Sequence, residues 1–172
     1  MRGGLPEHID PLHLADAAVQ LAGDLPVARL QRLKAMLASE DGSVRVTARF
    51  GVDEQGRRVL ELKATASLEM TCQRCMGRVA VPVAVDAALE LVPEESSDDA
   101  ASERYEPLFV SRDRMSLAEI VEDELLLQLP MIPRHEDGDE ACRPAAGPGD
   151  GQAKDTAREN PFAVLATLKD RQ

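Results

Sequence analysis

Two cysteines separated by two residues, Cys72 and Cys75, are the residues of this chain whose type and spacing most clearly suggest chemistry. A Cys-x-x-Cys turn between two strands can aim both sulfurs at one point, and zinc prefers four thiolate or imidazole ligands in a tetrahedron. His135 and Cys142 supply two further ligands of the right type, separated from Cys75 by 59 and 66 residues. Gly77 fits a turn whose backbone amides approach the sulfurs. We therefore predict a Cys3His site for Zn2+ made by Cys72, Cys75, His135 and Cys142.

Two other interpretations of the cysteines stay open. The chain has three cysteines, and an odd number in a reducing compartment argues against a disulfide framework and leaves ordinary unpaired thiols as one alternative. A redox couple of Cys72 and Cys75 is the other alternative, supported by the nearby Arg74 and Arg78. A low thiolate pKa usually requires a helix N-terminus or clustered positive charge, however, and this cysteine pair precedes a strand.

Positive charge gathers in the middle of an acidic chain. The formal net charge is −11, yet residues 28–78 carry ten Lys or Arg and six Asp or Glu, whereas residues 79–172 carry nine and 21. A positive sheet face could contact RNA phosphates, and an ordinary solvated outer face is the alternative. The candidate rRNA-binding residues are four arginines of the predicted sheet: Arg45, Arg49, Arg74 and Arg78.

Three adjacent acidic residues, Glu122, Asp123 and Glu124, lie in a predicted helix. Neighbours on a helix point in directions about 100° apart, so these carboxylates do not converge on a magnesium ion by themselves. They form a solvated helix face or a surface that binds a basic protein. Because an acidic chain repels nucleic acid over long range, phosphate affinity would have to come from a local patch or a basic partner.

The sequence lacks the common catalytic signatures. It contains no His-Glu-x-x-His pair, no Gly-x-Ser-x-Gly turn and no phosphate-binding glycine loop, so we predict a non-enzymatic protein without a small-molecule substrate. Three Phe, one Tyr and no Trp disfavour recognition of single strands by base stacking. No apolar run is long enough for a membrane span or a signal peptide, which predicts a cytoplasmic protein without membrane contact.

Helical spacing predicts two helices in the N-terminal quarter. Asp10-Pro11 is a typical helix start, and the apolar residues after it predict a helix that continues to Gly23. A second helix should run through Leu30, Leu33 and Leu37 and end near Asp41-Gly42. The apolar residues of the first helix are Leu12, Ala15, Ala18, Val19 and Ala22.

From Ser43 the apolar period changes from 3.6 to 2, which is typical of half-buried strands. Three alternating stretches predict an antiparallel β-meander with a turn at residues 53–56 and with the cysteine pair at the second connection. Pro82 cannot donate to a ladder, so its stretch should be an edge or a bulge. The alternating stretches are Val44–Phe50, Leu60–Met70 and Val79–Leu91.

The C-terminal half alternates between predicted loops and helices. Residues 93–104 should be a flexible acidic loop, and residues 136–158 should be disordered. Between them, a capping box at Ser116 should open a helix that ends after Gln128. Asn160-Pro161 should start a short helix that requires docking for stability. The fold class is thus predicted to be α+β, in a single domain over residues 1–172 with a small antiparallel sheet flanked by N-terminal and C-terminal helices.

Several separated stretches resemble one family, YceD, the large ribosomal RNA subunit accumulation proteins. The stretches occur in the order of the family and cover essentially the whole chain. They are "DP" at 10–11, "CQRC" at 72–75, "YEP" at 105–107, "VEDELLLQLPMIPRH" at 121–135 followed by Cys142, and "NPFAVLATLK" at 160–169.

The resemblance implies a non-enzymatic cytoplasmic factor needed for normal accumulation of 23S rRNA and so for large-subunit biogenesis. Two partners are compatible with the residues: 23S rRNA on the arginine-bearing sheet face, or a basic large-subunit ribosomal protein on the acidic helix. From a different class, a thiol-dependent redox protein that uses Cys72 and Cys75 is the alternative.

Overall fold

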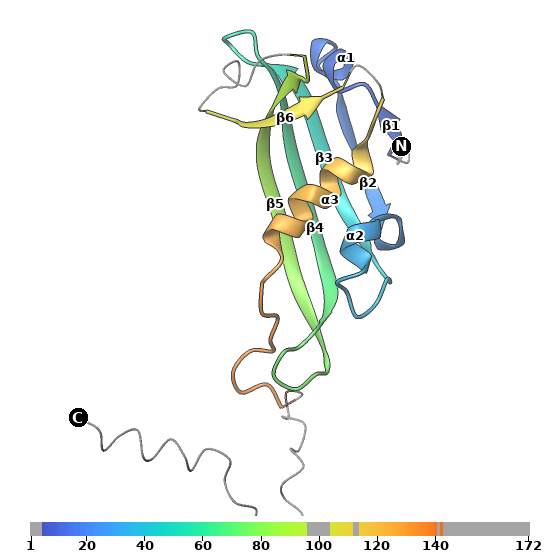
Figure 1. Ribbon diagram of the computed structural model, residues 1–172, viewed down its shortest axis with the longest axis vertical. Helices are drawn as coiled ribbons and strands as arrows, with labels where there is room; N and C mark the ends of the chain where they lie inside the picture. The colour runs from blue at the N-terminus through green and yellow to red at the C-terminus, as the bar shows by residue number, and fades with distance from the viewer. Residues whose placement is uncertain (1–4, 96–103, 112–113, 141, 143–172) are drawn as a thin grey trace, which may run out of the picture.

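The computed structural model describes residues 5–95, 104–111, 114–140 and 142 (Figure 1). Its five-stranded sheet has the order β2-β3-β4-β5-β6, and β1 pairs with β7 in a second, two-stranded sheet. The strands are β1 His8–Ile9, β2 Gln20–Pro26, β3 Ser43–Val52, β4 Arg58–Thr71, β5 Arg78–Pro93, β6 Glu106–Val110 and β7 Met115–Ser116. The helical segments are α1 Pro11–Asp16, the 3-10 turn η1 Val27–Arg29, α2 Gln31–Lys34 and α3 Leu117–Gln128.

The predicted α+β class and the central meander are confirmed. Strands β3, β4 and β5 pair antiparallel in sequence order, with the β3–β4 turn and the cysteine-bearing β4–β5 turn at opposite ends of the sheet (Figure 1). Alternation places Val46, Leu62 and Val85 on a buried face and the charged residues between them on an exposed face. The period of two therefore sets which side chains enter the core.

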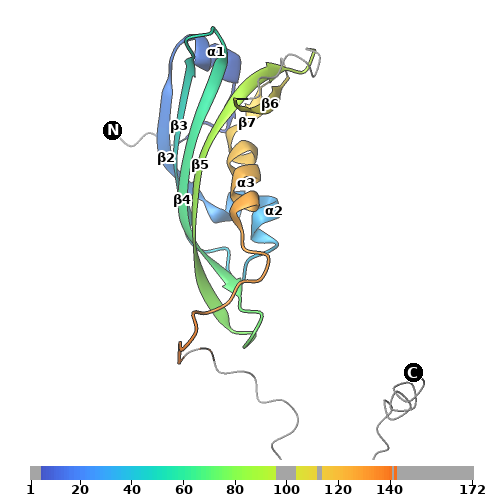
Figure 2. The same cartoon turned by 90° about the vertical axis from the view of Figure 1, so that its left-hand side faces the viewer.

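Helix α3 covers the buried face of the sheet, together with α2, whereas the opposite face stays open (Figure 2). The Ser116 side chain accepts a hydrogen bond from the Glu119 amide at 3.4 Å, which confirms the predicted start of this helix. One stripe of α3 is buried against the sheet: Leu117, Ile120, Val121 and Leu125. At about 1.5–3 kcal/mol for each large apolar side chain removed from water, this stripe fixes α3 on the sheet.

The first predicted helix is too long, because α1 ends at Asp16 and residues 20–26 form strand β2 instead. The Val19 amide donates to the Leu14 carbonyl and the Ala18 amide to the Ala15 carbonyl, both at 3.1 Å. These two bonds make a Schellman motif, which ends a helix through one residue in the left-handed region. Ala18 is that residue, with φ 49°. Glycine usually fills this position, so an alanine there gives no sequence signal for the helix end.

The second predicted helix is also shorter than expected, since α2 ends at Lys34 rather than near residue 41. The chain then leaves the helix to bond with the sheet: the Ala38 amide donates to the Glu69 carbonyl of β4 at 2.7 Å. Leu37 packs against the small apolar cluster near the cysteines. Tertiary contacts therefore override a helical pattern that continues in the sequence.

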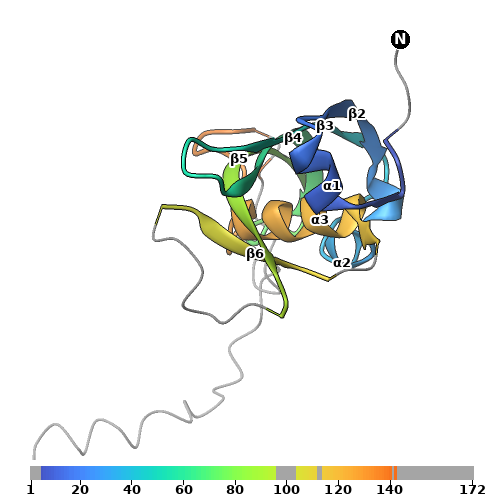
Figure 3. The same ribbon diagram turned by 90° about the horizontal axis from the view of Figure 1, so that it is seen from above.

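The sheet contains one parallel pair that the meander did not predict. β6 pairs parallel with residues 89–93 of β5, so the sheet is mixed rather than purely antiparallel. Seen from above, β6 lies next to β5 (Figure 3). In the described part of the chain, β5 has no strand partner beside Pro82 on that side, which agrees with the predicted edge. Residues 96–103 of the expected acidic loop, most of the segment 136–158 and the short helix expected at 160–161 lie outside the described residues.

Replacing Ala18 by glycine should stabilise the protein. A non-glycine residue in the left-handed region costs about 1–2 kcal/mol, which glycine would avoid. The larger backbone entropy of glycine in the unfolded chain offsets part of this gain in stability. We expect Ala18→Gly to raise the free energy of unfolding by about 0.5–1 kcal/mol in urea titrations. The matched control is Ala17→Gly, because φ is −89° there and glycine should destabilise. Equal effects of the two changes would contradict the strain at Ala18.

Candidate metal centre

The β4–β5 turn holds Cys72 and Cys75 in a compact backbone arrangement. The Cys72 amide donates to the Gly77 carbonyl at 2.8 Å, and the Met76 amide donates to the Cys72 carbonyl at 2.9 Å. Two further amides, each two residues after a cysteine, point at sulfur: Arg74 N to Cys72 Sγ at 3.5 Å and Gly77 N to Cys75 Sγ at 3.4 Å. A Cβ at position 77 would lie 3.3 Å from the Cys75 sulfur, so glycine permits this close approach.

The segment after α3 brings the other two ligands to this turn. It runs along the molecule to the hairpin tip, where the Gln73 amide donates to the Pro133 carbonyl at 2.9 Å (Figure 1). A short turn follows, in which the Cys142 amide donates to the Asp139 carbonyl at 2.9 Å. The fold thus closes the long sequence interval between Cys75 and His135. Cys72 and Cys142 are buried in a small apolar cluster with Met70 and Val79.

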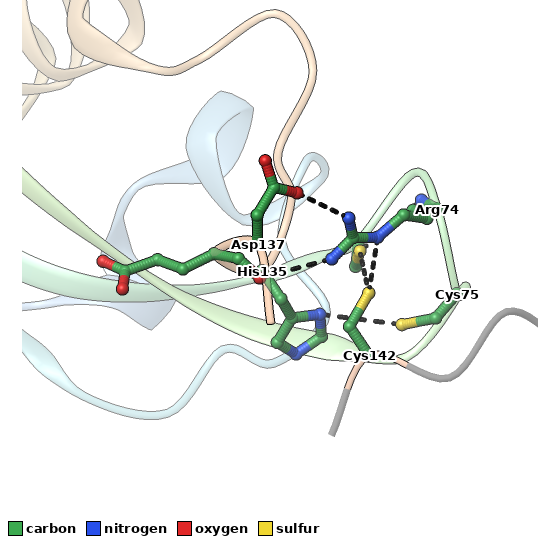
Figure 4. A network of polar contacts seen from close by, with 7 residues as sticks. Arg74, Cys75, His135, Asp137 and Cys142 are labelled. Carbon is green, nitrogen blue, oxygen red and sulfur yellow. Dashed lines mark hydrogen bonds and ion pairs between the residues drawn. The ribbon is translucent and has the colours of Figure 1, made fainter. Parts of the chain in front are cut away.

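All four predicted ligands meet at one point, and their ligand atoms lie within 4.8 Å of one another. The Cys72 and Cys142 sulfurs are 3.8 Å apart, and the Cys75 sulfur is 3.6 Å from His135 Nδ1 (Figure 4). Tetrahedral zinc with its usual bond lengths requires about 3.8 Å between two sulfurs and about 3.6 Å between sulfur and nitrogen. The donor types and these distances fit Zn2+, which would be held by Cys72, Cys75, His135 and Cys142.

The thiols of the turn differ in acidity. Burial raises the pKa of Cys72, but hydrogen bonds from the backbone amides of Cys75 and Arg74, together with those from the backbone and side chain of His135, outweigh it, and the pKa falls to about 5. The Gly77 amide lowers the pKa of Cys75, yet burial and the neighbouring Cys72 and Cys142 thiols together raise it above its ordinary value. A metal ion binds the deprotonated thiolate and so must displace the protons of neutral thiols. Because of its low pKa, the Cys72 thiol is already deprotonated at neutral pH.

Arg74, one of the four predicted rRNA-binding arginines, bonds to a candidate metal ligand. Its Nε donates to the Cys142 sulfur at 2.9 Å, and its Nη1 pairs with Asp137 at 2.8 Å (Figure 4). Its Nη2 also donates to the Glu136 carbonyl at 3.3 Å. Three thiolates around a divalent ion would leave one excess negative charge, which a guanidinium at this distance would balance. Nothing in the sequence pairs Arg74 with Cys142, so sequence reasoning missed this role and that of Asp137.

The other three predicted arginines lie on or beside the open face of the sheet, each next to an acidic residue. Cross-strand register places Arg45 beside Asp24 and Arg49 beside Glu61, with nitrogen-to-oxygen distances of 3.7 and 3.8 Å. Arg78 pairs with Glu69 at 3.2 Å. Exposed pairs of this kind contribute about 0–1 kcal/mol to stability, but they reduce the positive potential that would attract phosphates.

The three acidic residues of α3 have different environments. Glu122 is buried, and its carboxylate accepts hydrogen bonds from the Arg32 and Leu33 amides at 2.8 and 3.0 Å and from Arg32 Nε at 3.0 Å. It therefore joins α3 to the start of α2 and does not lie on a solvated face. Asp123 is exposed and pairs with Arg32, and burial raises the pKa of the partly exposed Glu124. Of these three residues, Asp123 and Glu124 reach the surface of α3, where Glu119 is also exposed.

The fold and the site define an α+β protein in which the segment after α3 (the C-terminal arm, residues 129–140 and 142) meets the tip of the β4–β5 hairpin at a candidate Cys3His metal centre. The chain belongs to the YceD family: the family model described as "Large ribosomal RNA subunit accumulation protein YceD" matches residues 60–169. A relative of that name from Haemophilus influenzae is 30% identical over 171 residues, which cover 97% of each chain. No solved structure matches this chain. Among the described residues, no helix is long and apolar enough to cross a membrane.

The protein should bind about one zinc ion per chain when purified without chelator, and Arg74→Gln should weaken that binding. Loss of a side chain that supports a ligand typically lowers metal affinity about 10–100-fold. Elemental analysis gives the stoichiometry, and competition with a chromophoric chelator gives the affinity.

Arg78→Gln is the matched control, since Arg78 lies on the same hairpin but bonds to Glu69 instead of a ligand. We expect this change to leave the zinc affinity unchanged. A clearly sub-stoichiometric zinc content that added zinc does not raise would contradict the metal centre. Equal affinities of the two variants would contradict the role of Arg74.

Proposed function

We propose that this chain is a non-enzymatic cytoplasmic factor that supports the accumulation of 23S rRNA, and so large-subunit assembly, by binding rRNA or a ribosomal protein. The observation that carries the proposal is family membership over nearly the whole chain, because the name of the relative links that protein to large ribosomal RNA accumulation. The chain would then act by holding another macromolecule.

The candidate metal centre supports a binding role over catalysis. Four protein ligands fill a tetrahedral site, as in structural zinc sites, whereas catalytic zinc keeps one position open for water or substrate. Two of the ligands come from the hairpin and two from the C-terminal arm, so a metal ion here would join two parts of the fold. The role of the metal ion would be structural, since it would cross-link segments that are distant in the sequence.

The charge distribution favours a basic protein over RNA as the partner. Arg45 and Arg49 of the open sheet face lie beside acidic residues, and Arg74 bonds to the metal centre. On α3, Glu119 is exposed and Glu124 is partly exposed, whereas Asp123 pairs with Arg32. A basic ribosomal protein would be attracted by the acidic parts of this chain, which carries a net charge of −11.

Charge variants distinguish the two partners in cells that lack their own YceD protein. We expect the double change Asp123→Asn and Glu124→Gln to lower the ratio of 23S to 16S rRNA, because it removes two of the three carboxylates, with Glu119, at the surface of α3. The double reversal Arg45→Glu and Arg49→Glu should leave the ratio unchanged, since these cations lie beside carboxylates. The ratio is measured by electrophoresis of total RNA.

A control variant is Glu54→Gln, which removes one exposed negative charge at the distant β3–β4 turn. Urea titration of each purified variant excludes a loss of fold, which matters because Asp123 pairs with Arg32. If the arginine variant lowers the ratio of 23S to 16S rRNA and the acidic variant does not, the partner is instead rRNA bound on the sheet face. Direct binding of 23S rRNA would then weaken with salt. Each arginine that no longer neutralises a phosphate would reduce the slope of the logarithm of the binding constant against the logarithm of salt concentration by about 0.9.

One observation favours the alternative of a thiol-dependent redox protein: the pKa of Cys72 is lowered to about 5, as in reactive cysteines. Redox cycling between Cys72 and Cys75 would form a disulfide by giving two electrons and two protons to an oxidant. We expect no such cycling, because Cys72 is buried. Mass spectrometry after exposure to oxidised glutathione should show free or metal-bound thiols. Rapid disulfide formation that Cys75→Ser abolishes, together with lost 23S accumulation, would support the redox alternative.

A further inference from the structure

A groove of about 800 Å³ lies beside the candidate metal centre, between β5 and the segment that follows α3. Residues 79–82 of β5 form one wall, and residues 130 and 132–139 form the other. The β5 wall is an edge, since β6 pairs only with residues 89–93. Pro82 removes one donor from this edge, which favours contacts with side chains over a continuous added strand.

The groove has apolar residues that the fold leaves exposed. Ile132 lines it and is 56% exposed, and the preceding Met131 is 97% exposed. Pro130 and Pro133 extend the apolar wall on one side, and Val81 extends it on the other. Single exposed apolar side chains are common on protein surfaces, but a contiguous set that lines a groove is typical of a binding site.

The same groove also has acidic lining residues. Among the described residues that line it, Glu136, Asp137 and Asp139 are acidic and Arg134 is the one Lys or Arg. The side chain of Asp137 is 99% exposed even though one of its oxygens bonds to Arg74. An apolar groove with acidic lining residues is complementary to a segment that carries both apolar and basic side chains.

The contacts of the metal centre hold the second wall in place. The Gln73 amide fixes Pro133, the guanidinium of Arg74 fixes Asp137, and the ligands His135 and Cys142 enclose the acidic stretch. Among the described residues, no helix or strand follows α3, so this wall depends on those contacts. Opening of the Cys3His set would therefore loosen the groove and leave the sheet intact.

We infer that this groove binds a basic amphipathic segment of a partner protein, and that binding requires the closed Cys3His centre. The inference rests on the proposed function in its protein-partner form and adds the surface, the chemistry of the ligand and the dependence on metal. Apolar side chains of the partner enter beside Ile132 and Val81, and its Lys or Arg side chains face the exposed Glu136 and Asp137.

The test uses the full zinc-loaded chain and a fluorescein-labelled 18-residue peptide of leucine and lysine in an amphipathic helical pattern. Fluorescence anisotropy should show saturable binding, whereas the same peptide with glutamate in place of lysine should not bind. Ile132→Ser should raise the Kd at least about tenfold, which corresponds to about 1.4 kcal/mol. Val52→Ser is the matched control, because Val52 is 50% exposed at the opposite end of the sheet, and its Kd should change less than about twofold.

Metal dependence is tested with the same peptide. Removal of zinc by chelation, and separately Cys75→Ser, should each raise the Kd at least about tenfold while the far-ultraviolet circular dichroism of the sheet is retained. Unchanged affinity after verified zinc removal would overturn the metal dependence. Equal affinities of Ile132→Ser and Val52→Ser would overturn the groove as the binding surface.

A photoreactive benzoylphenylalanine in place of Met131 identifies the occupant. Crosslinks to the lysine–leucine peptide support the inference, whereas crosslinks to residues 143–172 of the same chain or to a second copy overturn it. The proposed function is judged separately by 23S accumulation in cells. If the unmodified chain restores accumulation but binds no peptide, only the groove inference fails; if it does not restore accumulation, the proposed function fails.

Discussion

The packing of α3 on the sheet is the interaction on which the rest of the structure depends. Its apolar stripe buries the inner face of β3, β4 and β5, and its direction decides where the following residues go. Because α3 lies across the sheet with its C-terminal end towards the β4–β5 turn, the next residues reach that turn without a long loop (Figure 1). The four candidate ligands meet as a consequence of core packing, with 59 residues between Cys75 and His135.

Glu122 makes this arrangement more specific. A carboxylate at a buried position of α3 would be costly without partners, but it accepts two backbone amides and a guanidinium from the start of α2. A buried charge with satisfied hydrogen bonds fixes one relative placement of two helices, whereas apolar contacts alone tolerate small shifts. Asp123 and Glu124, its neighbours in the sequence, remain at the surface, so three similar residues serve two different purposes.

The sequence predicted the elements whose signals are local. A period of two along three stretches predicted β3, β4 and β5, and a capping serine predicted the start of α3, because burial on one face and hydrogen bonding at a helix end select residue types directly. Strand β2 was missed because the helix before it is terminated by a Schellman motif whose left-handed residue, Ala18, is an alanine where glycine is usual. Strand β6 was missed because its parallel partner is distant in the sequence and its five residues carry little pattern.

In the candidate site, too, the sequence predicted some residues and not others. Residue types alone predicted which four side chains would come together, since few side chains other than Cys and His suit zinc. The supporting contacts could not be predicted, because they depend on which backbone groups the fold brings near the sulfurs. Arg74 is the clearest example: its place beside Cys72 suggested a cation for phosphate, and the fold instead places its guanidinium 2.9 Å from the Cys142 sulfur.

This placement has an electrostatic consequence for the whole hairpin end. A divalent ion with three thiolates would carry a net charge of −1, and Arg74 would bring the centre close to neutrality. The sign of the surrounding surface is then set by Glu136, Asp137 and Asp139, which outnumber Arg134. The sheet face, by contrast, places its arginines beside carboxylates. A basic ligand approaching this chain would therefore meet attraction at the hairpin end, where apolar side chains are also exposed, rather than at the centre of the sheet.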